Sequence, residues 1–414
     1  MLFRSYLKIS LVLKDVLLLS LLVAQLPAVA ILLSRLLRGP GRYPPLQPQA
    51  SRPENLGQVS VVVPTLNEAK RLTPCLTGLS QQSYEVREMI VVDSHSSDGT
   101  PDLVKAIQQR DPRFRLVNDD PLPSGWVGRP WALHHGFQTS SDQSEWILGL
   151  DADTQPHAGL IASLLAVARK ENYDLISLAP CFILKEWGEL LLHPALLMTL
   201  VYRFGPAGET GNLPERVMAN GQCFFCRRSQ LAEIGGYTVA RQSFCDDVTL
   251  ARAIATQGAR VAFLDGSNVL KVRMYEGAVE TWREWGRSLD LKDAATASQV
   301  WGDWLLLLAV QGLPIPVLLL VCGDLISGRA TPVALAVFSL NLLLVLIRLG
   351  LNWAIAPSCD RTHARAARVF WFSPLADPIA VLRIFLSSLQ TPTQWRGRSY
   401  GARDEGDPAQ GIRA

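Results

Sequence analysis

The chain has 414 residues and a formal net charge of +3, and it lacks the clustered basic and aromatic residues that mark nucleic-acid binding, so no nucleic-acid partner is expected. Hydrophobic residues make up 48% of the chain and the mean hydropathy is +0.16, which predicts a membrane protein. The seven cysteines are scattered along the chain, and we interpret them as free thiols in a reducing compartment.

The first long apolar segment lies near the start of the chain. Residues 16–34 contain no charged side chain and are about as long as a bilayer-spanning helix. Arg35, Arg38 and a proline-rich stretch follow without a small-residue cleavage site, so a cleaved signal peptide is not expected. We predict an N-terminal transmembrane segment over residues 1–38 and a tether over residues 39–56.

Short apolar strands alternating with helix-like segments come next. The predicted strands are residues 59–64, 89–92, 114–117 and 145–150. This alternation predicts an α/β domain with a mostly parallel central sheet, in which ligands bind at the carboxyl ends of the strands. Polar residues follow three of these strands: Asn67, Glu68, Asp93, Asp98, Asp151 and Asp153. The alternative is that they only solubilise loops.

Asp151 and Asp153 are one residue apart, directly after the fourth strand. Side chains two positions apart on a strand share a face, so both carboxylates could converge on one divalent cation, from the strand or from a turn just beyond it. Carboxylate oxygens suit Mg²⁺ or Mn²⁺, particularly where substrate phosphates complete the coordination shell.

A second acidic pair, Asp246 and Asp247, precedes a helix-favouring stretch at residues 251–255. An acid at this position can stabilise the amino end of a helix. A carboxylate can equally take the proton of an attacking hydroxyl. Both interpretations stay open for the pair.

Four motifs together resemble those of family 2 glycosyltransferases with the GT-A fold: residues 62–68, 91–94, 150–153 and 245–247. The resemblance implies an inverting transfer from a nucleotide-activated sugar, usually a UDP-sugar, assisted by a divalent cation. It implies that Asp153 is the main metal contact, with Asp151 beside it, and that Asp247 is the general base, with Asp246 as the competing candidate.

The resemblance also implies a donor site built on the first two strand ends. Pro64, Asn67, Glu68 and Asp93 would hold the nucleoside of the donor. The sequence departs from the family at Ser94-His95-Ser96, where many relatives have Asp-Gly-Ser.

Arginines are the candidate contacts for the donor diphosphate. Arg129 follows a glycine where family members often carry Gly-Lys, and its guanidinium can bind phosphate through two hydrogen bonds; a surface cation is the alternative. Arg283 and Arg287 are four residues apart, so they would share a helix face and bind either the diphosphate or lipid headgroups. The Gln-x-x-Arg-Trp signature of processive relatives is absent there, which favours transfer of a single sugar.

The catalytic domain is expected over residues 57–300, and two transmembrane helices over residues 301–358, the second with Arg348 positioned to snorkel. A tail over residues 359–414 contains a short apolar segment, 375–389, predicted to be interfacial or re-entrant. By the positive-inside rule, the arginines that follow the predicted spans place the catalytic domain in the cytoplasm. The basic residues that precede the first span favour the opposite orientation.

Attachment at both ends to a membrane predicts a lipid acceptor. Residues 185–203 form an apolar stretch that reads as either a core helix or a lipid-docking segment. The stretches around residues 125–129 and 274–290 are similar to those of carotenoid-glycosylating and hopanoid-associated members. A carotenoid hydroxyl is therefore the expected acceptor, with polyprenyl phosphate, hopanoid or diacylglycerol as alternatives. The alternative of another class is a catalytically silent membrane scaffold.

Overall fold

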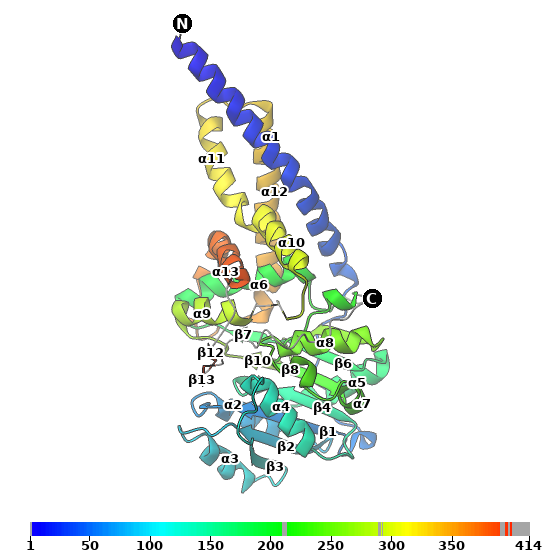
Figure 1. Ribbon diagram of the computed structural model, residues 1–414. Helices are drawn as coiled ribbons and strands as arrows, with labels where there is room; N and C mark the ends of the chain where they lie inside the picture. Colours follow the sequence, from blue (N-terminus) through cyan, green and yellow to red (C-terminus); the bar gives the residue numbers. More distant parts are fainter. Residues whose placement is uncertain are drawn as a thin grey trace.

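The computed structural model describes residues 2–208, 213–288, 291, 293–389, 394–395 and 398–399, with the backbone alone for residues 2–12, 286–288 and the last four. A globular part is built on two sheets, and a group of helices projects from one end of it (Figure 1). The side chain of Arg287 and the last part of the predicted tail, including residues 400–414, therefore lie outside the described part of the chain.

The central sheet has seven strands in the order β3-β2-β1-β4-β8-β6-β9. Strand β8 pairs antiparallel with both of its neighbours, and every other pairing in this sheet is parallel, which confirms the predicted sheet. The strands are β1 (Val59–Thr65), β2 (Val86–Asp93), β3 (Phe114–Asn118), β4 (Trp146–Leu150), β6 (Leu175–Ala179), β8 (Cys223–Arg227) and β9 (Val261–Asp265).

Both faces of this sheet are buried, because helices cover each of them. Successive residues of β1 alternate between two cores: Val61 packs with Leu76 and Leu164 on one face, and Val62 packs with Leu133 on the other. The covering helices are α2 (Leu72–Ser80), α3 (Thr100–Gln108), α4 (Gly128–Thr139), α5 (Leu160–Glu171), α7 (Arg228–Glu233) and α8 (Asp246–Thr256).

A second, four-stranded sheet joins distant parts of the chain. Its order is β11-β7-β10-β5, and the strands are β5 (Thr154–Pro156), β7 (Cys181–Ile183), β10 (Leu270–Val272) and β11 (Cys359–Asp360). Strand β11 belongs to the segment predicted as a tail, and its pairing with β7 fixes the chain that follows α12 to the globular part. A two-stranded ladder is formed by β12 (Gln394–Trp395) and β13 (Arg398–Ser399).

Short helical turns complete the globular part. The tether contains η1 (Gly39–Gly41) and η2 (Pro53–Asn55), and it lies along the domain because the amide of Leu46 donates to the carbonyl of Asp265. The other turns are η3 (Pro214–Arg216), η4 (Thr238–Ala240) and η6 (Ala356–Ser358).

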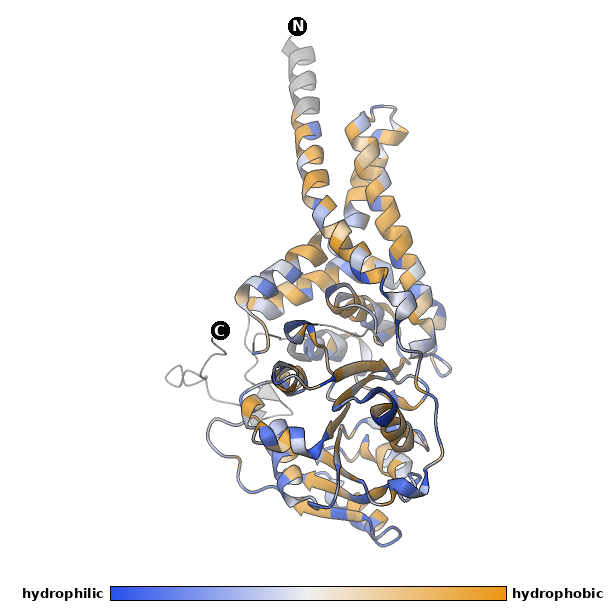
Figure 2. Cartoon of the chain, turned by 90° about the vertical axis from the view of Figure 1, so that its right-hand side faces the viewer, coloured by the Kyte–Doolittle hydropathy of each residue, from blue (hydrophilic) through white to orange (hydrophobic). Residues whose placement is uncertain are grey.

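Long apolar helices form the projecting group, which is coloured as hydrophobic in Figure 2. Three helical stretches are long and apolar enough to cross a membrane: Leu13–Gly41, Pro332–Ser358 and Ala367–Leu389. They include α1 (Leu2–Leu36) and α12 (Pro332–Ile355). Buried amides of Gln25 and Asn341 hydrogen bond to each other and join these two helices.

The span predicted over residues 304–326 is a bent pair. Helices α10 (Ala297–Leu307) and α11 (Pro314–Ile326) meet at 43° and are separated by the π-helical turn η5 (Leu308–Gly312). Pro314 explains the break, because proline lacks the amide hydrogen that would continue the helix from the preceding turn.

The last apolar stretch lies against the globular part. It consists of the 3₁₀ helix η7 (Ala367–Ala376) and α13 (Asp377–Leu389). Helix α13 packs on α6 (Trp187–Phe204) and α9 (Gly277–Ser288), which lie between the sheets and the projecting helices (Figure 1). Helix α6 covers most of the apolar segment at residues 185–203, and 12 of its 18 residues are buried.

Arg348 does not snorkel, which corrects the expectation from its place near the end of α12. Its guanidinium pairs with Asp377 at 2.8 Å, and both side chains are buried. Gln311 donates to the same carboxylate, and Asn352 accepts from Arg348. An isolated charge is costly in an apolar environment, so a nearby carboxylate replaces the path to the membrane surface.

Candidate active site

A single cavity of about 1150 Å³ runs along the carboxyl ends of the strands toward the projecting helices. Its wall brings together eight of the residues predicted for the site: Pro64, Glu68, Arg129, Asp151, Asp153, Asp246, Asp247 and Arg283. This set spans more than two hundred positions of the sequence, from Pro64 to Arg283, and the fold brings its members to one cavity.

Asp151 and Asp153 reach the cavity from a turn beyond β4, which was one of the two geometries left open. The strand ends at Leu150, and Thr154 closes the turn by donating its hydroxyl to the carbonyl of Asp151 at 2.7 Å. Ala152 is buried between them. Both carboxylates line the cavity, and their oxygens are donors of the kind that Mg²⁺ or Mn²⁺ prefers.

Protein side chains alone do not surround a metal ion here. Among the residues that the structure describes, no three His, Cys, Asp or Glu side chains gather into a metal site. A cation held by Asp151 and Asp153 would therefore draw its other ligands from water and from the substrate.

Arg129 clamps two of the acidic residues together. It donates from Nε at 3.0 Å and Nη2 at 2.8 Å to Oδ1 of Asp151, and from Nη1 to Asp246. Nη2 also donates to the carbonyl of Gly221 at 2.8 Å. A Cβ on Gly221 would stand 2.4 Å from Nη2, so the close approach requires glycine. The role predicted for Arg129 at the diphosphate stays a prediction.

The acidic pair at the start of α8 separates into two environments. Asp246 is buried and paired with Arg129, while Cys245, the N-cap residue of α8, makes no side-chain capping hydrogen bond within the described part of the chain. Asp247 lines the cavity and accepts a hydrogen bond from the amide of Val248 at 2.9 Å. Burial, together with the neighbouring Asp246 charge, raises the pKa of Asp247 to about 7, although Arg129 opposes the shift. This carboxylate can accept a proton near neutral pH.

Asn67 and Asp93 are not part of the cavity lining: Asp93 is buried and Asn67 is exposed. The carboxylate of Asp93 accepts from the amide of Ser96 at 2.9 Å, and Asn67 accepts from the amide of Ser97 at 3.0 Å. Both residues shape the loop after β2. In that loop His95 has φ of 60°, a left-handed conformation that favours glycine, which accounts for the glycine of many relatives at this position.

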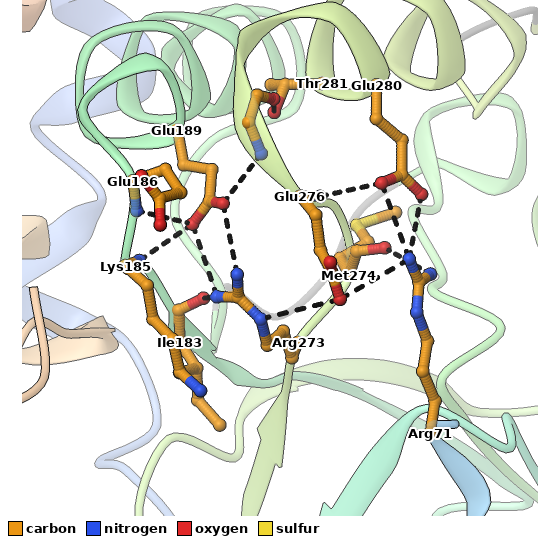
Figure 3. A network of polar contacts seen from close by, with 11 residues as sticks. Arg71, Ile183, Lys185, Glu186, Glu189, Arg273, Met274, Glu276, Glu280 and Thr281 are labelled. Carbon is orange, nitrogen blue, oxygen red and sulfur yellow. Dashed lines mark hydrogen bonds and ion pairs between the residues drawn. The ribbon is translucent and has the colours of Figure 1, made fainter.

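A polar network that the sequence motifs did not reveal supports the cavity (Figure 3). Buried Glu189 on α6 accepts from Arg273 and from the amide of Gly277 at 2.8 Å, at the start of α9. Arg71, which follows the predicted donor loop and lines the cavity, donates to Glu280 on α9 at 3.0 Å. The sequence signal for Glu189 was the capping-box spacing of Glu186 and Glu189 at the start of α6, where Glu189 accepts from the amide of Glu186.

The sequence matches a known family over part of its length. Residues 60–235, less than half of the chain, match Glycosyl transferase family 2. This stretch contains β1 to β8, the Asp151–Asp153 turn and Arg129. This part of the chain is therefore similar to family 2 glycosyltransferases, in line with its motifs.

The names of two similar proteins contain the name of a pigment or of a lipid. The chain is 27% identical to a 4,4'-diaponeurosporenoate glycosyltransferase of Staphylococcus haemolyticus over 60% of this chain and 65% of the relative. It is 29% identical to a GalNAc(5)-diNAcBac-PP-undecaprenol beta-1,3-glucosyltransferase of Campylobacter jejuni over 31% and 40%. The chain thus spans less than two thirds of the length of these relatives.

The fold has a solved counterpart. The structure is similar to that of the mannosyltransferase PcManGT from Pyrobaculum calidifontis, solved with GDP-Man and Mn²⁺, with a TM-score of 0.53. The match covers 91% of this chain and 98% of that one, at 18% sequence identity. The domain accordingly has the GT-A-like fold that the motifs implied.

Proposed function

We propose that this protein is a membrane-bound, inverting glycosyltransferase that moves one sugar from a nucleotide-sugar donor to a hydroxyl of a lipid. One observation carries the proposal: the same cavity is lined by the acidic residues of the glycosyltransferase-like domain and by apolar side chains of the projecting helices. A water-soluble acceptor would not require the apolar part of this lining.

The donor is assigned to the strand-end side of the cavity. Pro64 and Glu68 line it there, and Asp93 supports the loop behind them, as expected for residues that hold a nucleoside. Asp153, with Asp151, has the oxygen donors to hold Mg²⁺ or Mn²⁺. When bound, such a cation would offset the negative charge that develops on the departing diphosphate.

Asp247 is the proposed general base. It faces the cavity, and its raised pKa places proton uptake near neutral pH, where a base is most effective. Asp246 is neutralised by Arg129 and is therefore the weaker candidate. Arg129 would fix the position of Asp151 relative to the base rather than carry the reaction itself.

The acceptor side is apolar. Its lining comes from the end of α1, from α6 and from the last turns of α12: Leu36, Leu197, Leu200, Val201, Phe204, Leu351, Ala354 and Ile355. An aliphatic or polyene chain could bury its length here while its hydroxyl meets Asp247. A carotenoid is the acceptor we favour, in line with the diaponeurosporenoate relative. Polyprenyl phosphate, hopanoid and diacylglycerol are the alternatives, the first in line with the undecaprenol relative.

The proposed topology keeps the catalytic domain on the cytoplasmic side, where nucleotide sugars are made. Arg35 and Arg38 at the end of α1 and Arg361 and Arg365 after α12 support it, since basic residues flank the cytoplasmic ends of membrane spans.

The test uses membranes that contain the protein, a panel of radiolabelled UDP- and GDP-sugars, and a pigment-bearing lipid extract, with and without a chelator. Chelator-sensitive label in a pigment fraction is the expected result. Label in a colourless lipid would contradict the carotenoid acceptor and leave the enzyme class standing. Donor binding with no transfer to any lipid would contradict the proposed activity and favour the silent scaffold.

A further inference from the structure

Two of the five arginines that line the cavity are already neutralised. Arg71 is paired with Glu280, and Arg129 with Asp151 and Asp246. A departing nucleoside diphosphate gains negative charge as its bond to the sugar breaks, and cations committed to carboxylates respond to that charge only weakly. The cations without such partners are therefore the informative ones.

Three arginines of the wall differ from these in having no carboxylate partner within the described residues: Arg42, Arg283 and Arg383. Two of them, Arg283 on α9 and Arg383 on α13, come from helices that pack against each other. The Nε of Arg383 is buried without a hydrogen-bond partner within that part of the chain. The guanidinium of Arg383 lies over the ring of Trp282, 5.4 Å from its centroid. Trp282 directly precedes Arg283 in α9, so Arg383 contacts the helix turn that carries Arg283.

A chain of contacts relates these arginines to the donor carboxylates. Arg71 lies within electrostatic reach of Asp153 and binds Glu280. Arg283 is three residues beyond Glu280, so the two side chains lie one turn apart on the same side of α9. Helix α9 therefore faces the part of the cavity that contains Glu68 and Asp153.

The base comes from another part of the cavity wall. Helix α8, which carries Asp247, lies to the right of helices α9 and α13 in Figure 1, and all three helices contribute residues to the cavity wall. In an inverting displacement the nucleophile attacks the sugar opposite the leaving group. A hydroxyl activated by Asp247 would thus leave the diphosphate on the side of α9 and α13.

Resting on the proposed function, we infer that Arg283 and Arg383 form a diphosphate subsite, and that the C-terminal helix α13 completes the donor site. During transfer the bond between the anomeric carbon and the diphosphate oxygen breaks, and its electron pair stays on that oxygen. The acceptor oxygen forms the new bond, and its proton goes to Asp247. Arg283 and Arg383 hold the oxygen that gains the charge.

This role also accounts for an unusual feature of the C-terminal stretch. Ala367–Leu389 has the length and composition of a membrane span, yet α13 packs on α6 and α9. A helix buried in lipid could not present Arg383 to the cavity without the cost of desolvating its charge.

The test measures UDP and GDP binding and sugar transfer with the full-length protein in detergent. Arg383→Gln and Arg283→Gln should each lower kcat/KM about 100-fold and weaken nucleoside diphosphate binding, while binding of the free nucleoside is unchanged. Arg383→Lys should recover part of the loss, since it keeps the charge. Arg368→Gln, an exposed arginine of η7 outside the cavity lining, is the matched control.

Three results would overturn the inference. The first is nucleoside diphosphate binding by Arg383→Gln equal to that of the control. The second is a loss confined to binding of phosphatidylglycerol vesicles, which would assign the arginines to lipid headgroups. The third is a wild-type protein that binds no nucleoside diphosphate, which would remove the donor site and the proposed function with it.

Discussion

At the scale of single residues, the account depends on Asp247. Replacing it with Asn removes the proton acceptor and keeps the size of the side chain, so transfer should fall about 10²- to 10⁴-fold while donor binding is retained. Asp246→Asn instead leaves Arg129 with one carboxylate and should weaken donor binding as well. Equal losses of donor binding in both variants would contradict the assignment of the base.

The pH dependence follows from the same carboxyl group. Burial first, and then the charges of Asp246 and Asp151, raise the pKa of Asp247 from 3.8 to about 7, although Arg129 opposes the shift. The base works only when ionised, so kcat/KM should rise with pH through about 7. Because the folded protein holds this proton more tightly than the unfolded chain, the contribution of Asp247 to the free energy of unfolding is lost as the pH rises from 3.8 to about 7. A pH profile that is flat from 5 to 8 would contradict the assignment.

Gly221→Ala tests the arginine clamp. Its Cβ would stand 2.4 Å from Nη2 of Arg129, which two carboxylates hold in place. We expect a loss of transfer of about tenfold or more with a change in unfolding temperature of a few degrees. Gly125→Ala, whose Cβ would have no contact nearer than 3.5 Å, controls for changes in a cavity-side loop, although its φ of 77° adds some strain.

At the scale of elements, α9 is positioned by its close packing on α6. A Cβ on Gly188 would stand 2.5 Å from Cβ and 2.6 Å from the amide nitrogen of Ala278. Gly188→Ala should therefore push α9 away and destabilise the protein by about 1–3 kcal/mol, measured by thermal unfolding in detergent. Gly302→Ala in α10, where a Cβ meets nothing within 4 Å, should cost nothing. Unchanged stability and activity of Gly188→Ala would mean that α9 is not fixed by α6.

The elements that the sequence predicted best are those specified by local pattern. The β-branched runs at β1 and β2 are buried on both faces as expected. The carboxylates of the Asp151–Asp153 turn and of α8 line the cavity, and each has a local signal, because the turn follows a strand and Asp246 begins a helix. Their roles stay predictions.

Long-range pairs were missed because nothing local specifies them. Arg71 and Glu280 are 209 residues apart, and Arg273 and Glu189 are 84 apart. Arg348 was expected to snorkel because hydropathy gives the depth of a residue in a membrane but not its neighbours. Arg383 carried no motif, and its place in the cavity depends on the packing of α13.

At the scale of the whole molecule, the ion pair of Arg348 and Asp377 joins α12 to α13. Asp377→Asn would leave a buried guanidinium without a countercharge and should cost about 3–5 kcal/mol. Asp324→Asn removes the partner of Lys14 in a more exposed pair and should cost less than about 1 kcal/mol. Thermal unfolding in detergent compares the two, and equal effects would contradict a structural role for the buried pair.

The central claim is that one cavity connects the donor carboxylates to the membrane helices, and Ala354→Trp tests it most directly. An indole at this position on α12 fills the apolar side of the cavity, whereas Leu349→Trp places the same ring on the exposed side of that helix. We predict that Ala354→Trp loses about tenfold or more of lipid glycosylation while nucleotide-sugar binding stays as in Leu349→Trp. Undiminished transfer to the lipid would show that the acceptor does not enter through this cavity.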